Sequence, residues 1–133
     1  MIGHYGLILF VLVMGVAGCA GSPARLAMMS PDELAAVRLP DLCNAYSSVG
    51  GSDVEAEILR RQAITDDEWE LVRAKKIAVG MSTCALLASW GAPSTINTSA
   101  SRAGERQQWV YGICQYCKRR YVYVRGGEVI GWN

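Results

Sequence analysis

The fold of this chain is decided near its C-terminal end, by residues 106–132, RQQWVYGICQYCKRRYVYVRGGEVIGW. In residues 106–113 a period of two would place Trp109 and Tyr111 on one face and Gln108 and Val110 on the other, and aromatic and β-branched residues predominate in residues 121–124 and 128–132. This pattern is typical of strands, and the pair Gly126-Gly127 between the last two segments is typical of a tight turn. We therefore predict a three-stranded antiparallel β-meander.

Helix signals precede these strands. In a capping box, a Ser or Thr caps the start of a helix and a Glu three residues later caps it in return. The pattern occurs at Ser30-Pro31-Asp32-Glu33, Ser52-Asp53-Val54-Glu55 and Thr65-Asp66-Asp67-Glu68. We expect a helix to begin at each place, forming an acidic helical extension over residues 30–76.

A last helix is predicted for residues 83–90, where Gly91 and Pro93 end it. Residues 94–99 follow as an extended lead-in to the strands. Helices that precede strands, rather than alternating with them, define the α+β class. The predicted fold is a helical N-terminal half, then a short helix and the three-stranded meander, with residues 77–133 as an α+β domain.

The start of the chain is interpreted as a signal peptide, residues 1–18. Its apolar run at residues 7–14 is shorter than the roughly 20 residues that cross a hydrocarbon core as a helix. The following Val16-Ala17-Gly18-Cys19 resembles the lipobox of bacterial lipoproteins. That resemblance implies cleavage before Cys19, lipidation of Cys19 and, with Ala20 after it, a lipid-anchored, periplasm-facing place on the outer membrane. Residues 19–29 then form a tether.

The second half of the chain resembles a known domain. The motifs are Ile77-Ala78-Val79-Gly80-Met81-Ser82, Trp90-Gly91-Ala92-Pro93, Gln108-Trp109-Val110-Tyr111-Gly112, and Tyr121-Val122-Tyr123 with Gly127-Glu128-Val129. Their order resembles the SmpA/OmlA (BamE-like) family of outer-membrane lipoprotein domains. The resemblance implies a helical pair packed on a three-stranded sheet. It also implies an adaptor or stabilising subunit of a cell-envelope complex, with support of β-barrel assembly as the specific expectation.

Composition and residue types argue against an enzyme. The 133 residues carry a net charge of +1 and are 51% hydrophobic, which excludes a charged disordered tail and a polytopic membrane protein. The one histidine, His4, lies in the expected signal peptide, so no Ser–His or Cys–His pair can form in the mature chain. The acidic residues 66–70 lie at a helix start, where they suit the helix dipole. We expect no catalytic residue, cofactor or metal.

Four cysteines remain in the mature chain, Cys43, Cys84, Cys114 and Cys117. An even number in an oxidising compartment favours disulfides, and four cysteines allow three connectivities. A bond between Cys114 and Cys117 would clamp the turn between two strands and leave Cys43 to join Cys84. Free buried thiols, a zinc site and a redox-active pair remain alternative interpretations of the same residues.

Charge is divided along the chain. Residues 32–70 hold ten acidic and three basic side chains, and residues 71–133 hold nine basic and two acidic ones. The two halves could attract each other. Alternatively, a basic aromatic hairpin could contact an acidic protein partner, anionic lipid, lipopolysaccharide or another envelope polymer, whereas the compartment disfavours nucleic acid. The candidate contact residues are Lys118, Arg119, Arg120, Tyr116 and Tyr121.

Overall fold

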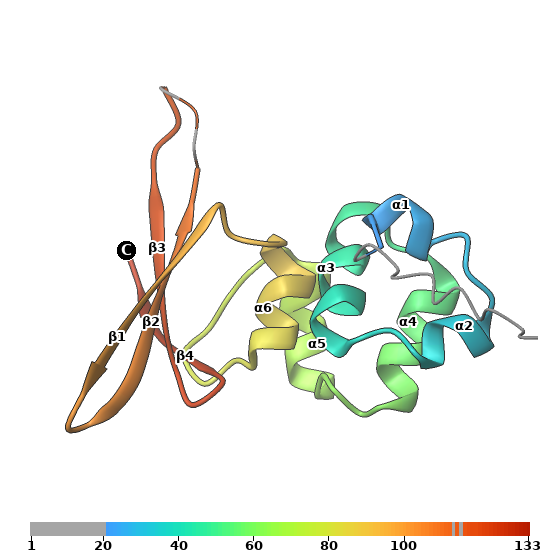
Figure 1. Ribbon diagram of the computed structural model, residues 1–133, viewed down its shortest axis with the longest axis horizontal. Coiled ribbons are helices and arrows are strands. Elements are labelled where there is room, and N and C mark those ends of the chain that lie inside the picture. Colours follow the sequence, from blue (N-terminus) through green and yellow to red (C-terminus); the bar gives the residue numbers. More distant parts are fainter. Residues whose placement is uncertain (1–20, 113, 115) are drawn as a thin grey trace, which may run out of the picture.

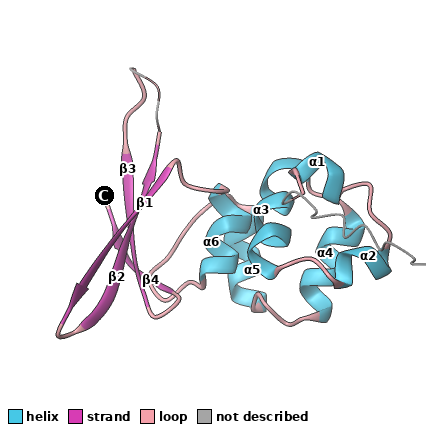
Figure 2. Ribbon diagram, in the orientation of Figure 1, coloured by secondary structure: helices cyan, strands magenta, loops and turns pink. Residues whose placement is uncertain are grey.

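Helices fill the first two thirds of the structure and strands fill the last third, which confirms the α+β class (Figures 1 and 2). The computed structural model describes residues 21–112, 114 and 116–133. The helices of this part are α1 (Pro23–Leu26), α2 (Pro31–Ala35), α3 (Leu39–Val49), α4 (Ser52–Arg60), α5 (Asp66–Arg73) and α6 (Thr83–Trp90). Its strands are β1 (Thr95–Ser101), β2 (Gly104–Tyr111), β3 (Arg120–Arg125) and β4 (Glu128–Trp132).

The sheet has four antiparallel strands in the order β1-β2-β3-β4, so the prediction of three strands was wrong. The additional strand, β1, covers the segment that was expected to be only an extended lead-in. It pairs with β2 in an unbroken register from Thr95 opposite Val110 to Ser101 opposite Gly104. All seven of its residues are exposed and only Ile96 is large and apolar. The alternation that marks a half-buried strand is therefore missing from its sequence.

Two of the three predicted capping boxes are confirmed. The Ser30 backbone N–H donates to Glu33 Oε2 at 2.8 Å, and the Thr65 backbone N–H donates to Glu68 Oε2 at 2.9 Å. The third was wrong, because Gly51 is the N-cap of α4 and Ser52 is its first residue, with no side-chain cap bond. Glu55, the expected partner, contacts Arg73 of α5 instead.

The predicted tether, residues 19–29, is partly folded. Residues 23–26 form α1, and Leu26 is buried with only 2% of its surface exposed. This short helix packs against α3. The part of the chain that can act as a tether is therefore shorter than the sequence suggested.

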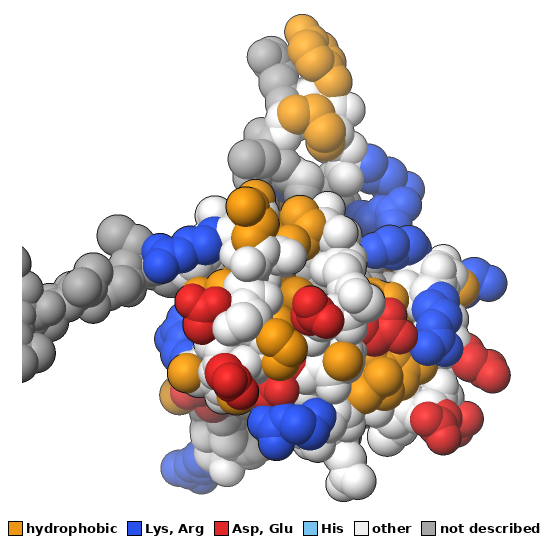
Figure 3. Space-filling model, turned by 90° about the vertical axis from the view of Figure 1, so that its right-hand side faces the viewer, with side chains coloured by type: hydrophobic (Ala, Val, Ile, Leu, Met, Phe, Trp, Pro, Cys, Tyr) orange, Lys and Arg blue, Asp and Glu red, His pale blue; other side chains and the backbone are white. Residues whose placement is uncertain are grey.

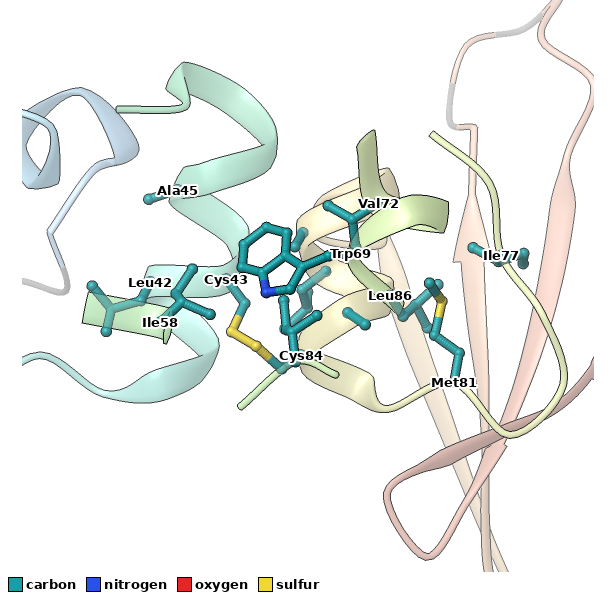
Figure 4. Close-up of a cluster of buried hydrophobic side chains, with 14 of the residues drawn as sticks. Leu42, Cys43, Ala45, Ile58, Trp69, Val72, Ile77, Met81, Cys84 and Leu86 are labelled. Atoms are coloured by element: carbon teal, nitrogen blue, oxygen red, sulfur yellow. A yellow bond between two sulfur atoms is a disulfide. The ribbon is translucent and has the colours of Figure 1, made fainter. Parts of the chain in front are cut away.

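The core is one continuous cluster that runs from the helices into the sheet. Trp69 of α5 lies at its centre, packed edge-on against Tyr46 with ring centroids 5.2 Å apart. Figure 4 shows its indole beside the bridge between Cys43 and Cys84. Because α6 packs against α3, α5 and β4, it links the two layers.

Residues 80–83 join the helical layer to the sheet. The Gly80 N–H donates to the Val129 carbonyl and the Val129 N–H donates to the Met81 carbonyl, both at 2.8 Å. The Ser82 N–H donates to Glu68 Oε1 at 2.6 Å, and the Ser82 hydroxyl accepts from the Ala85 N–H as the cap of α6. This segment therefore covers the outer edge of β4.

A second junction lies at the other end of α6. Trp90 and Tyr111 pack edge to face with ring centroids 5.5 Å apart, and the Tyr111 hydroxyl donates to the Gly91 carbonyl at 3.1 Å. Burial raises the pKa of Tyr111 well above its usual range, so this hydroxyl stays protonated and keeps its donor. Between the two junctions the sheet stands away from the helices.

Candidate functional site

The four cysteines form two disulfides of different character. Cys43 of α3 is joined to Cys84 of α6, with the Cα atoms 5.3 Å apart. Both residues are buried in the core, where dissolved thiols have little access. This bond therefore ties two helices together within the fold (Figure 4).

The second disulfide joins Cys114 to Cys117 in the loop between β2 and β3. Redox-active pairs with this spacing usually begin a helix, whose dipole lowers the thiol pKa. Here the loop leads into β3, so that electrostatic assistance is missing. In the described part of the chain, no three His, Cys, Asp or Glu residues are grouped as a metal site would require.

Four of the five predicted contact residues are exposed, and the fifth, Tyr121, is half-buried. Tyr116 projects from the loop with 92% of its surface exposed, and Lys118 and Arg119 are exposed beside it. Arg120, at the start of β3, stacks its guanidinium 5.3 Å from the Trp90 ring centroid. Tyr121 is half-buried and, as the next residue of the strand, faces the opposite side of the sheet. Arg120 is exposed and continues the basic surface of the loop, whereas Tyr121 does not lie on that surface.

The acidic helices do not neutralise this loop. Among the described residues, three of the four salt bridges connect neighbours on the helices, and only Arg73 with Glu55 links the basic and acidic halves of the sequence. In Figure 3, which views the molecule from its helical end, acidic and basic side chains are both spread over the helices, and one group of basic side chains lies below the projecting loop. Lys118 and Arg119 therefore keep their charge available to an outside partner.

A groove lies between the helical layer and the sheet, where the two layers stand apart. It has a volume of about 860 Å³. Its helical wall includes Pro40, Asn44 and Leu87, and its sheet wall includes Ile96 and Trp109. Ile96 is 46% exposed, so apolar surface remains accessible to water here. Such a groove suits the binding of a partly apolar segment.

Polar groups hold the groove in shape. The Trp109 indole N–H donates to Gln107 Oε1 at 3.0 Å, which orients both side chains on the sheet wall. On the helical wall, Asn44 Oδ1 accepts from the Ala92 N–H at 2.8 Å and fixes the chain after α6. Glu105 and Arg125 add one charge of each sign to the lining.

Sequence reasoning missed this groove. Its walls come from five separate elements, α3, α6, β1, β2 and β3, and each contributes only a few side chains. Ile96 was the one local signal, as a large apolar residue in an otherwise polar stretch. A single residue of that kind is common on protein surfaces, so it could not identify a site.

The predicted lipidation residue, Cys19, lies outside the described residues. Within them, no helix is both long and apolar enough to cross a membrane. No family model matches the sequence, and neither the curated proteins nor the solved structures include one that is detectably similar to it.

Proposed function

We propose that this protein is a non-enzymatic lipoprotein of the bacterial outer membrane, anchored through Cys19 and facing the periplasm. It acts as an adaptor or stabilising subunit of a cell-envelope complex. The resemblance of residues 77–132 to SmpA/OmlA domains makes β-barrel assembly the process to test first. The structural observation that supports this proposal is the groove between the helical layer and the sheet.

The groove favours a protein partner for two reasons. Its side chain Ile96 is apolar and exposed, which is a feature that protein interfaces use. Its walls are fixed by hydrogen bonds and by the Cys43–Cys84 bridge behind α3, so binding requires little reorganisation of this protein.

Photo-crosslinking from inside the groove tests the adaptor role. A photoreactive benzoylphenylalanine in place of Glu105, which is exposed on the sheet wall, would be activated in intact cells. We expect a defined covalent adduct with another envelope protein, and mass spectrometry identifies that protein. The matched control places the same group at Arg25, an exposed position on the remote helix α1. Equal labelling from both positions, or none from the groove, would contradict an adaptor role for the groove.

A separate experiment tests the lipid anchor at Cys19. If Cys19 receives the lipid, Cys19→Ala leaves an uncleaved precursor that carries no acyl chains, because the thiol is the acceptor of the first lipid. Radiolabelled palmitate and intact mass measure this directly. Normal maturation of the variant would remove the lipoprotein proposal.

A second candidate function is supported by the loop between β2 and β3. Its two exposed cations, Lys118 and Arg119, and the protruding Tyr116 suit contact with anionic lipid headgroups or lipopolysaccharide. Each basic residue near an anionic surface contributes about 1 kcal/mol, so Lys118→Glu with Arg119→Glu should reduce binding to phosphatidylglycerol vesicles more than tenfold.

The control for that experiment is Arg25→Glu with Arg102→Glu, which changes the net charge equally at two exposed positions outside the loop. Equal losses for both pairs would mean that net charge, and not the loop, attracts the membrane. Flotation of vesicles with bound protein distinguishes the two results.

A further inference from the structure

The two edges of the sheet are protected very differently. The outer edge of β4 is covered by residues 80–83, which hydrogen-bond to it and form a bridge between Ser82 and Glu128. The register between β3 and β4 also shifts near Val124, which interrupts the regular strand. β1 lies at the opposite edge of the sheet and pairs only with β2 in the described part of the chain.

β1 lacks the features that prevent edge strands from associating. Natural sheets protect their edges with charges, prolines, bulges or short strands. The seven residues of β1, TINTSAS, contain no charge and no proline, and their register with β2 has no shift. Every second residue of an antiparallel edge strand presents its N–H and C=O groups away from the sheet. This row of backbone groups is suited to another strand.

We propose that β1 pairs with β1 of a second copy of this chain, antiparallel and about a two-fold axis at Thr98. In this register each Thr98 lies opposite its own copy, Ile96 opposite Ala100 and Asn97 opposite Ser99. A large side chain therefore meets a small one, and amide meets hydroxyl. Because β1 is uncharged, the symmetric contact brings no like charges together.

The shape of the molecule is compatible with this arrangement. Figure 1 shows the sheet at one end of the longest axis and α1 toward the other end, with all helices on one side of the sheet. The two-fold axis of an edge-to-edge antiparallel pair runs perpendicular to the joined sheet. Both helical layers then project from the same side, with their α1 helices pointing the same way, as two chains anchored in one leaflet require. The pairing itself does not depend on the proposed function.

Cysteine crosslinking of the full mature protein in detergent tests the register. Thr98→Cys places two thiols across the axis with Cβ atoms about 5 Å apart, so mild oxidation should give a covalent dimer in high yield. Ser101→Cys is the matched control on the same exposed strand, since two copies of residue 101 lie about 20 Å apart in this register. Mixed Thr95→Cys and Ser101→Cys chains should form the mixed disulfide, although neither forms one readily alone.

A charge placed at the two-fold axis tests the strength of dimerisation without relying on a covalent bond. Thr98→Lys brings two like charges together and should weaken dimerisation about tenfold or more in sedimentation equilibrium. Ala103→Lys in the exposed turn adds the same charge away from the contact and should leave it unchanged. A monomer at every concentration would overturn the proposal. A dimer whose affinity is unchanged by Thr98→Lys would also overturn it. The same holds if the edge of β1 pairs only with a strand of another protein.

Discussion

The buried hydrophobic residues are distributed unequally between the helical layer and the sheet. Of the buried hydrophobic residues in the described chain, only Trp109, Val122, Val124 and Val129 lie in strands. The helices and their connections supply the others, together with the buried disulfide. The sheet instead carries the projecting loop, the open edge and one wall of the groove. The layer that stabilises this fold is therefore different from the layer that offers most of the binding surface.

The largest expected effect on stability comes from replacing one tryptophan in each layer. Trp69→Ala removes a side chain that is 2% exposed from the centre of the helices, which should cost about 3–5 kcal/mol in the free energy of unfolding. Trp109 is 5% exposed, but Trp109→Ala should cost less, about 3 kcal/mol, because the part of this residue that lines the groove lacks packing partners. Urea unfolding measures both. Equal losses would mean that the sheet is packed as tightly as the helices.

Trp69→Phe is the matched variant. Within the described structure the buried Trp69 Nε1 has no hydrogen-bond partner, so replacing the indole by a phenyl ring removes no bond. The loss should stay below about 1.5 kcal/mol. A loss as large as that of Trp69→Ala would contradict this explanation.

Removing one disulfide at a time should again show a larger loss of stability for the helical layer than for the sheet. Cys43→Ala with Cys84→Ala opens a loop with a sequence separation of 41 and should cost about 4 kcal/mol by the chain-entropy argument. Cys114→Ala with Cys117→Ala opens a separation of 3 and should cost about 2 kcal/mol. Thermal and urea unfolding of the two variants give the ranking. The reverse order would show that the loop, and not the helical layer, depends most on its bridge.

The helical layer should also respond to acid through Glu57. Hydrogen bonds from Arg60 and Arg61 lower its pKa from 4.5 to about 2, although burial opposes this shift. Because the folded protein favours the carboxylate, the stability from these contacts is complete above pH 4.5 and is lost as the pH falls toward 2. Arg61 also donates to the carbonyls of Leu34, Ala35 and Val37, so protonation of Glu57 loosens the contact between α4 and α2.

Unfolding free energies measured from pH 5 to pH 2 test this assignment. Glu57→Gln should flatten the part of the curve between pH 4.5 and 2, because the amide cannot titrate. Asp53→Asn, at an exposed position on the same helix, is the control for the change in net charge. An unchanged slope in Glu57→Gln would assign the acid sensitivity to other carboxylates.

The smallest expected effect is the difference between two predicted caps in the helical layer, only one of which is a cap in the structure. Thr65→Ala removes a side chain that accepts from the Glu68 N–H at 3.3 Å and should cost about 1 kcal/mol. Ser52→Ala should stay within about 0.5 kcal/mol, because Gly51 and not Ser52 is the cap of α4. Chemical denaturation resolves the difference. A similar loss at both positions would mean that the Ser52 hydroxyl stabilises the helix in another way.

Much of the helical layer could be predicted from local patterns. Ser30 and Thr65 cap their helices as their capping boxes predict, and Trp69 and Val72 are buried at the spacing of one helix face. Capping depends on side chains within one helical turn, so the sequence contains all the necessary information. Ser52 matched the same pattern without acting as a cap, because Gly51 begins that helix.

The site was harder to predict. The basic loop could be recognised as a run of charges, but the positions of Arg120 and Tyr121 depend on where β3 starts, which places them on opposite faces of the sheet. The strand β1 has little hydrophobic signal of its own and exists through its pairing with β2. Its contribution to the sheet edge and to the groove therefore could not be predicted from residues 95–101 alone.

The sequence by itself determined the α+β class, the helix ends that have local caps, the turn at Gly126-Gly127 and the even number of cysteines that could pair. These features depend on residues that are close together or on simple counting. The tertiary structure alone decided the fourth strand, the groove between the layers and the difference between the two sheet edges. Each of these depends on contacts between segments far apart in the chain, because an edge strand exists only beside its neighbour and a groove only between two walls.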